Sequence, residues 1–371
     1  MIPALRRLSA RYAGTPPLRL SLALQGGGAH GAFTWGVLDR LLEEEALAID
    51  AVSGTSAGAV NAVALAWGWC RGGRAGARDL LAQLWHAIGR AGRHHAAFPR
   101  GGLGALAVDL ATHLFSPYQL NPLGIDPLRQ LLEDLVDFAA LRRNAPMKLL
   151  IAATHVRTGR CRLFREHELT PAMVLASACL PQIHRAVEIQ GELYWDGGFS
   201  SNPPVVALAE LDGTARLLVV RLNPAEVGEP LRHASAIRHR TVQLVFARPL
   251  EDELAQLAAL CRLAVPPLAW AQPRLRRLGR LDLQIIDGGE MLALLDPATK
   301  LVPETRLLDQ LRQEGRAEAE RWLRRQGEGR DRSWSLPPAA VPASSGRSAR
   351  GMPRLLSWQW PGEKVGAREP G

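Results

Sequence analysis

Cysteine is scarce in this sequence, with four residues among 371. They are widely spaced, and no two of them form a Cys-x-x-Cys pair. In a chain of this length, such spacing argues against a disulfide framework and against a zinc site. We therefore expect small, mostly buried thiols in a reducing compartment and no metal site. The four are Cys70, Cys161, Cys179 and Cys261.

Long apolar runs are also missing. No window reaches about eighteen uncharged apolar residues, so the sequence predicts no membrane-spanning helix. Residues 1–17 carry arginines but no apolar segment before a small-residue cleavage site, which argues against a secretory signal. These absences predict a cytoplasmic protein that contacts a membrane at most peripherally, at its surface.

Basic residues outnumber acidic ones, giving a net charge of +9, and arginine contributes more than lysine. No basic run with interleaved aromatic residues and no known nucleic-acid-binding motif accompanies this charge, so we expect no nucleic-acid partner. An excess of arginine spread over solvated faces is the plainest interpretation. Attraction to anionic lipid headgroups fits the charge as well.

Strand-like and helix-like segments alternate along the chain, a pattern typical of an α/β fold with a parallel or mixed sheet covered by helices. The length allows one large domain or two. The expected strands span residues 18–24, 47–52, 147–156, 160–165, 217–222 and 281–286, with a short hairpin over 187–195. Helical spacing of apolar residues covers 32–42, 59–66, 77–90, 126–138, 170–179, 231–263 and 304–326.

Changes in composition divide the chain. Residues 1–17 are expected to form an N-terminal arm, and residues 18–326 the main domain, of which 231–326 is a helical C-terminal part. Residues 91–125 lose the regular pattern and gather glycine, proline and paired histidines, so we expect a lid there. In residues 327–371 glycine, proline, serine and arginine dominate, which predicts a disordered basic tail.

The stretch Gly54-Thr55-Ser56-Ala57-Gly58 places a serine on a tight turn. The apolar run 47–52 enters it and the small-residue segment 59–66 leaves it, so strand, turn and helix follow in order. The glycines let the backbone reverse sharply and leave the Ser56 hydroxyl exposed near a helix N-terminus. This context favours a nucleophilic serine, although Gly-x-Ser-x-Gly also arises by chance in a glycine-rich chain.

A glycine-rich loop, Gly26-Gly27-Gly28-Ala29-His30-Gly31, lies between the first strand and its helix. Its amides can face developing negative charge with the helix dipole behind them, which makes it a candidate oxyanion hole. The same residues match Gly-x-Gly-x-x-Gly, the dinucleotide fingerprint, which needs an acidic residue at the end of the second strand. Asp50 lies at the start of that strand instead. The two glycine turns together therefore favour acyl transfer.

A serine nucleophile needs a base, and none of the ten histidines stands in a telling local context. A Ser–Asp–His order can be assembled from Ser56, Asp196 and either His233 or His239. The better candidate is Asp196 alone. It lies on a Gly-Gly turn after a strand, where its carboxylate can accept the serine proton directly and later return it to the leaving alkoxide.

The letters Asp-Gly-Gly occur twice, at 196–198 and at 287–289. The motif alone therefore does not identify the base. Only the first copy is followed by Asn202-Pro203, and a structural turn aspartate is the default interpretation of Asp287.

Taken in order, the triple-glycine loop, the serine turn and Asp196-Gly197-Gly198 resemble the motifs of the patatin-like phospholipase family. Ala178-Cys179-Leu180-Pro181 before the aspartate turn and Ser201-Asn202-Pro203 after it extend the resemblance. It covers residues 18–222, and the chain up to residue 326 is similar to the C-terminal part of bacterial members only loosely.

The resemblance implies a three-layer α/β/α fold with a mainly parallel central sheet, and hydrolysis of acyl esters in lipids without a metal or cofactor. It implies a dyad of Ser56 as nucleophile and Asp196 as base, without a histidine. It also implies an oxyanion hole formed by the amides of Gly26, Gly27 and Gly28, with Ala57. The supporting motif positions are Gly31, Gly54, Gly58, Gly197 and Gly198.

Two positions depart from the family pattern. Many members have arginine or lysine where His30 stands, which leaves the headgroup preference open. After Pro181, His184 and Ala186 stand where an aromatic residue and a proline are common; His184 is either a border of the acyl pocket or a surface histidine.

The competing hypothesis is a catalytically idle scaffold, or a lipid- or granule-associated binding protein, with the same fold. The intact Ser56, Asp196 and triple glycine argue against it. The sequence specifies neither the lipid class, the acyl position and length, nor the oligomeric state.

Overall fold

One sheet of eight strands organises the computed structural model of the chain, which describes residues 17–95, 126–211, 213–223, 234–263 and 272–328. The strands are β1 (Leu18–Leu24), β2 (Leu47–Thr55), β3 (Lys148–His155), β4 (Cys161–Arg165), β5 (Val187–Ile189), β6 (Glu192–Asp196), β7 (Arg216–Arg221) and β8 (Asp282–Asp287). Hydrogen bonds link neighbouring strands along the path β5-β6-β3-β2-β1-β7-β8, with β4 also paired to β3. These described residues lie in the first of two units of the chain, residues 1–335.

Five neighbouring strands, from β3 through β2, β1 and β7 to β8, run parallel. Parallel sheets are covered on both faces, and their strands are accordingly apolar. The last five residues of β1 are buried, as is most of β3. The strands β4, β5 and β6 extend this sheet in antiparallel pairing. The expected mainly parallel sheet is confirmed.

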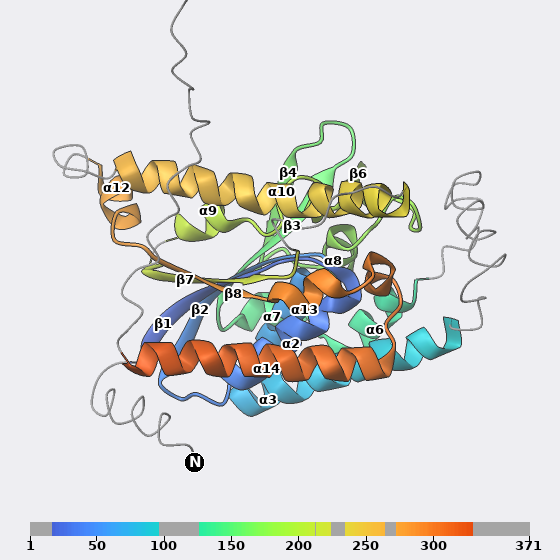
Figure 1. Cartoon of the computed structure of the whole chain (residues 1–371), viewed down its shortest axis with the longest axis horizontal. Helices are drawn as coiled ribbons and strands as arrows, with labels where there is room; N and C mark the ends of the chain where they lie inside the picture. Colours follow the sequence, from blue (N-terminus) through green and yellow to red (C-terminus); the bar gives the residue numbers. More distant parts are fainter. Residues whose placement is uncertain (1–16, 96–125, 212, 224–233, 264–271, 329–371) are drawn as a thin grey trace, which may run out of the picture. The chain divides into compact units, whose positions relative to one another are not determined.

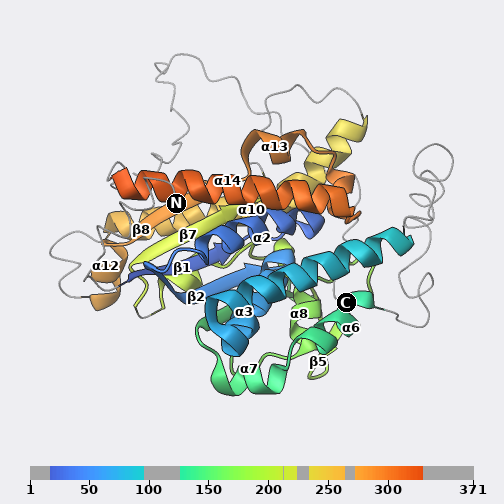
Figure 2. The ribbon, with the colours of Figure 1, turned by 90° about the horizontal axis from the view of Figure 1, so that it is seen from below.

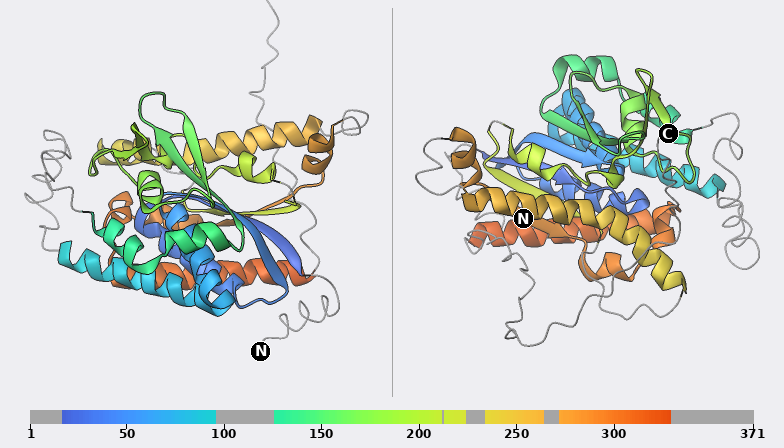
Figure 3. Two further views of the ribbon diagram at one scale, coloured as in Figure 1. Left: turned by 180° about the vertical axis from the view of Figure 1, so that it is seen from behind. Right: turned by 90° about the horizontal axis from the view of Figure 1, so that it is seen from above.

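Helices cover both faces of the sheet. On one face lie α2 (Gly31–Leu41), α3 (Ala57–His95) and α14 (Thr305–Glu328), and on the other lie α9 (Val205–Ala209) and α10 (Ala234–Leu263) (Figure 1). Figure 2 shows α14 and α3 from their own side, and the right panel of Figure 3 shows α10 crossing over the sheet. The three layers α/β/α agree with the expectation from the sequence. The remaining helices are α6 (Pro127–Leu135), α7 (Phe138–Asn144), α8 (Pro171–Ser177), α12 (Pro273–Leu278) and α13 (Gly289–Leu294), with short 3₁₀ turns η1 (Gly28–His30), η2 (Gly197–Phe199) and η3 (Pro297–Lys300).

Two helices differ from the periodicity of the sequence. The segment expected as one helix over 126–138 is divided: α6 ends at Leu135, Val136 is extended, and the side chain of Asp137 accepts the Ala140 N–H to cap α7. In α3, the expected segments 59–66 and 77–90 form one long element with a kink at Gly72 and Gly73. Helical spacing of apolar residues continues across both interruptions, so it could not reveal them.

The C-terminal part is built into the main domain. The strand β8 pairs with β7, and α14 packs along α2. Asp39 of α2, buried, pairs with Arg312 and Arg316 of α14 and with Arg78 of α3. The guanidinium of Arg312 also lies 4.6 Å above the Trp35 ring. Residues 231–326 therefore supply an edge strand and a covering helix of the same core.

The expected boundaries fall partly outside the described residues. The irregular insert was expected to begin at residue 91, but α3 continues through His95, and residues 96–125 of the expected lid lie outside the described part. The same holds for residues 1–16 of the arm and for 329–371 of the tail, whereas α14 runs on to Glu328.

The four cysteines differ in their burial. The expectation of mostly buried thiols is wrong, because Cys179 is buried while Cys161 is exposed and Cys70 and Cys261 are intermediate. Among the described residues, no helix is long and apolar enough to cross a membrane.

Candidate active site

Ser56 lies on the sharp turn between β2 and α3. Its φ of 54° falls in the left-handed region, which is strained for a residue with a side chain. The flanking glycines permit the turn: a Cβ on Gly54 would come 2.5 Å from the Gly58 carbonyl oxygen, and one on Gly58 would overlap the carbonyl of Leu24. Ser56 donates its backbone N–H to the Oγ of Ser177 at 2.9 Å, which ties the turn to α8.

The sheet brings Ser56 and Asp196 together along one edge of β3. Thr55, the last residue of β2, pairs with Ala152, and Asp196, the last residue of β6, pairs with the next residue, Ala153. The strand β4 pairs with residues of β3 that also pair with β2 or with β6. It therefore lies on the opposite edge of β3 from both of these strands. Because β2 runs parallel and β6 antiparallel to β3, their C-terminal ends meet. Residues 140 positions apart thus become neighbours.

Asp196 is fully buried at this junction. Its Oδ1 accepts the N–H of Gly198 at 2.7 Å, whereas Oδ2 has no hydrogen-bond partner in the described part of the chain. Burial raises the pKa of Asp196 to about 7, against the lowering effects of the Gly198 N–H and the Ser56 hydroxyl. The Ser56 hydroxyl thus lies close enough to the carboxyl group to lower its pKa, although it forms no hydrogen bond to Oδ2 in this conformation. The arrangement suits a proton acceptor.

The second Asp-Gly-Gly turn has the same local geometry and a different environment. Asp287 Oδ1 accepts the N–H of Gly289 at 3.0 Å, as Asp196 does from Gly198. Its Oδ2, however, accepts the Nε of Arg221 at 2.8 Å. The carboxylate of Asp287 is therefore neutralised by an arginine, while that of Asp196 is buried with an unsatisfied oxygen. This distinction supports the sequence interpretation of the two turns.

The glycine loop follows β1 and packs directly on the serine. A Cβ on Gly26 would lie 2.7 Å from the Cβ of Ser56, and one on Gly31 would lie 2.6 Å from that of Ala57. The N–H of Gly26 donates to Asn202 Oδ1 at 2.7 Å, so this amide is already engaged. The amides of Gly27 and Gly28 form no hydrogen bond within the described residues. Gly28 has a φ of 58°.

The glycines of the aspartate turn are also closely packed. A Cβ on Gly197 would overlap the carbonyl oxygen of Ala152, and one on Gly198 would overlap the Phe246 ring of α10. Thr154 donates its hydroxyl to the carbonyl of Asp196 at 2.8 Å. The turn is therefore fixed by β3 on one side and by α10 on the other.

Several supporting residues were not singled out from the sequence. Gln25 Oε1 accepts the N–H groups of Leu222 at 2.7 Å and Asn223 at 2.9 Å, and Asn223 Nδ2 donates to the Gly26 carbonyl at 2.9 Å. The side-chain amides of Gln25 and Asn223 are both buried. Their only sequence signal is an amide residue next to a strand end or a turn, which is common in loops.

Of the histidines singled out in the sequence, the side chains of His30 and His184 lie within the described residues. His30 is buried, its Nε2 lies 2.8 Å from the Thr299 hydroxyl, and burial, helped by Lys300, lowers its pKa to about 3. It is therefore neutral and faces η3. His184 is exposed. His233 and the side chain of His239, the candidates for a triad, lie outside the described part, so a triad with either stays untested.

The dinucleotide alternative finds no support in the strand geometry. Asp50 lies five residues before the end of β2 and pairs with Arg19 at 2.7 Å, far along the strand from the glycine loop. Among the described residues, no group of His, Cys, Asp and Glu side chains could hold a metal ion.

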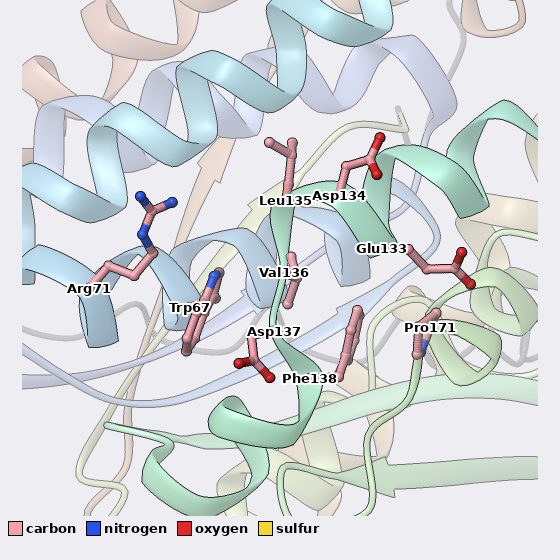
Figure 4. A pocket seen from close by; sticks show the side chains of 9 residues that line it. All are labelled: Trp67, Arg71, Glu133, Asp134, Leu135, Val136, Asp137, Phe138 and Pro171. Atoms are coloured by element: carbon pink, nitrogen blue, oxygen red, sulfur yellow. The ribbon is translucent and has the colours of Figure 1, made fainter.

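A hollow between α3, α6, α7 and α8 lies apart from the dyad (Figure 4). Apolar, acidic and basic side chains line it, and neither Ser56 nor Asp196 is among them. The lining residues are Trp67, Arg71, Glu133, Asp134, Leu135, Val136, Asp137, Phe138 and Pro171.

Comparison with known proteins gives a family. Residues 22–209 match the family model described as patatin-like phospholipase, which is half of the chain. The chain belongs to the patatin-like phospholipase family. The patatin-like domain thus holds Ser56, Asp196 and the glycine loop, and β8 and α14 lie beyond the matched residues. A search of curated proteins finds no match.

Among the solved structures that are similar to this chain are two bacterial proteins. VipD from Legionella pneumophila shares 14% identity with a TM-score of 0.39, over 83% of this chain and 67% of that chain. ExoU, in the heterodimeric ExoU–SpcU complex from the type III secretion system of Pseudomonas aeruginosa, shares 17% identity with a TM-score of 0.39, over 84% of this chain. The match spans 52% of the ExoU chain. The family assignment rests on the sequence match.

Proposed function

We propose that this protein is a serine lipid acyl hydrolase of the phospholipase A or lysophospholipase type, a carboxylic ester hydrolase that uses Ser56 and Asp196 as a dyad. The observation that carries the proposal is the buried Asp196 carboxylate, which has one unsatisfied oxygen and adjoins a strained serine turn. A group with these properties has a clear use as a base for the serine hydroxyl. Membership of the patatin-like phospholipase family supports lipid esters as substrates.

In the proposed reaction, Ser56 Oγ attacks the ester carbonyl while Asp196 Oδ2 takes its proton. The tetrahedral oxyanion accepts hydrogen bonds from the amides of Gly27 and Gly28, with Ala57 nearby, since the Gly26 amide is engaged by Asn202. Asp196 then returns the proton to the departing alkoxide, leaving the acyl group on Ser56. Water attacks this acyl-enzyme while Asp196 takes its proton, the bond between the acyl carbon and Ser56 Oγ breaks, and Asp196 returns the proton to Oγ as the fatty acid leaves. No step requires a metal or a cofactor.

We also propose that the protein contacts the membrane surface peripherally through exposed apolar side chains next to η3. The turn η3 packs against the glycine loop, and apolar side chains next to it are exposed: Leu294 by 86%, Leu301 by 56% and Val302 by 38%. Exposed apolar residues beside a lipid-hydrolysing site are suited to insertion between headgroups. In vesicle co-sedimentation, Leu294→Gln with Leu301→Gln should reduce binding. Leu263→Gln, at an exposed leucine on the end of α10, is the matched control.

The dyad is tested with Ser56→Ala and Asp196→Asn, assayed on a short p-nitrophenyl ester and on a lysophospholipid. Each variant should lose at least about a thousandfold in kcat. Asp287→Asn, in the other Asp-Gly-Gly turn, should keep its activity. Retained activity in either dyad variant would refute the dyad.

Labelling with a fluorophosphonate probe separates the hydrolase from an idle scaffold. The probe should modify Ser56 in the unaltered protein and not in Ser56→Ala. Absence of labelling together with absence of ester hydrolysis would favour the scaffold. Identification of the fatty acids released from a mixed lipid extract would then define the lipid class and the acyl position.

A further inference from the structure

Lys300 is a cation enclosed behind the glycine loop. It ends η3, and its Nζ donates to the Oδ1 of Asn223. No acidic side chain pairs with it within the described residues. Burial lowers the pKa of Lys300 to about 8, so the amine is still mainly protonated at pH 7. A half-buried cation without an acidic partner is energetically unfavourable, which points to a role for it.

The hydrogen bonds of Asn223 connect this charge to the glycine loop. Asn223 receives the Lys300 ammonium at Oδ1 and donates its Nδ2–H to the carbonyl oxygen of Gly26 at 2.9 Å. Its own backbone N–H is held by Gln25 Oε1. The side-chain amide therefore has one orientation, with the oxygen toward the cation and the nitrogen toward the loop.

The Gly26 carbonyl belongs to the same peptide unit as the Gly27 N–H. In a planar trans peptide these two groups point in opposite directions. With the carbonyl bound by Asn223, the Gly27 N–H points away from Asn223 and makes no hydrogen bond within the described residues. Hydrogen bonds in series polarise one another, so a cation at one end makes the N–H at the other end a stronger donor.

The main chain of η3 braces the same loop. The carbonyl of Lys300 occupies the space where a side chain on Gly28 would be, and Gly28 has a positive φ. The neighbouring Thr299 hydroxyl lies 2.8 Å from His30 Nε2 and donates to the Asp296 carbonyl, so the histidine donates to it. Lys300 thus sets both the charge behind the loop and the position of its backbone.

We infer that Lys300 is a positioning residue for ester hydrolysis: through Asn223 it polarises the Gly26–Gly27 peptide and strengthens the Gly27 N–H as an oxyanion donor. The inference rests on the proposed function. Lys300, in η3, lies 91 residues beyond the end of the matched family region at residue 209.

The variants are Lys300→Met, Lys300→Arg and Asn223→Ala, with Lys148→Met as the matched control at an exposed lysine of β3. In Lys300→Met, kcat per active site, counted by fluorophosphonate labelling, should fall about tenfold. This is less than the loss of about 10²–10³ that follows removal of a direct oxyanion donor. KM should change little, because the ground-state ester carries no charge for the loop to stabilise. Lys300→Arg should restore part of the loss.

Inhibition by a trifluoromethyl ketone lipid analogue distinguishes polarisation of the glycine loop by Lys300 from a merely structural role of this residue. Its adduct with Ser56 carries an oxyanion, so Lys300→Met should weaken its inhibition by about the same factor as kcat. Inhibition by an uncharged ether analogue of the substrate should not change. Equal weakening of both inhibitors would contradict the inference, as would an unchanged kcat.

A double-mutant cycle covers the case in which one variant folds poorly. Since Lys300 acts through Asn223, adding Lys300→Met to Asn223→Ala should cost little more than Asn223→Ala alone. Full additivity would overturn the relay. If the unaltered protein hydrolyses esters and these variants behave as the control does, the relay is wrong and the proposed function stands. If the unaltered protein hydrolyses no ester, the proposed function itself fails.

Discussion

The backbone N–H of Gly198 donates a 2.7 Å hydrogen bond to Oδ1 of Asp196, and the second carboxylate oxygen, Oδ2, is left without a partner in the described part of the chain. One oxygen is therefore fixed by the turn that follows the aspartate, and the other is free to exchange a proton. The same N–H also limits the rise of the pKa that burial causes. In this way a single turn both orients the proposed base and moderates the rise of its pKa that burial causes.

The proposed base must be ionised to accept the serine proton. Since burial raises the pKa of Asp196 to about 7, we expect kcat/KM to be low at pH 5 and to rise with a midpoint near pH 7. The measurement is hydrolysis of a p-nitrophenyl ester between pH 5 and 9, followed at the isosbestic wavelength of the product. A midpoint near 4, as for an exposed aspartate, would contradict the assignment.

The raised pKa of Asp196 also predicts an effect on stability. Between pH about 4 and about 7 the carboxyl is protonated in the folded chain and ionised in the unfolded chain, so its contribution to stability falls as pH rises through this window. Asp196→Asn keeps an acceptor for Gly198 and removes the buried charge. We expect this inactive variant to be more heat-stable than the unaltered protein at pH 8, by a few degrees, and equally stable at pH 4. Thermal unfolding at the two pH values tests this, and a variant less stable at pH 8 would contradict it.

The parts of the site that lie within one motif were predictable from the sequence. A strand, a glycine turn and a helix are written in consecutive residues, and the turns at Ser56 and Asp196 lie where the sequence predicts them. The strand β1 was predicted at its observed bounds because its apolar run is short and clearly flanked. Local sequence determines these features, since backbone conformation and strand burial depend on neighbouring residues.

Contacts between distant segments could not be predicted. Asn223 reaches Gly26 because β7 pairs with β1, and Lys300 reaches Asn223 only once β8 has joined the sheet. The sequence favoured Asp196 over Asp287 as the base, but it could not reveal the partner that makes their environments differ, Arg221, which lies 66 positions away from Asp287. Pairing of strands in space, more than any local pattern, decides such partners.

The serine turn depends on the absence of a side chain at Gly58. A Cβ there would overlap the Leu24 carbonyl at the end of β1, a backbone atom that cannot move aside. Gly58→Ala should therefore abolish labelling of Ser56 by a fluorophosphonate probe and lower the melting temperature. Gly72→Ala, at the kink of α3, is the control, because a Cβ there would meet nothing within 4 Å and its φ of −164° suits any residue. Labelling of Gly58→Ala at the rate of the control would show that the turn can relax.

Asp39 fastens α14 to the core, and this attachment should be sensitive to acid. Burial alone would raise the pKa of Asp39, but hydrogen bonds from Arg78, Arg312 and Arg316 hold it below its usual value. A carboxyl with a lowered pKa contributes stability that is present above its unfolded pKa, about 4, and is lost as pH falls further.

Asp39→Asn should therefore lower the free energy of unfolding by roughly 1–3 kcal/mol at pH 7, and by less at pH 3.5. Denaturant unfolding at both pH values measures this. The control, Asp50→Asn, removes the partner of Arg19, whose side chain is 68% exposed, and should change stability little. An equal loss at both pH values would mean that the missing acceptor oxygen, and not the missing charge, weakens the attachment of α14. Because η3 leads directly into α14, loosening this helix should also lower ester hydrolysis at neutral pH, through the brace that Lys300 provides behind the glycine loop.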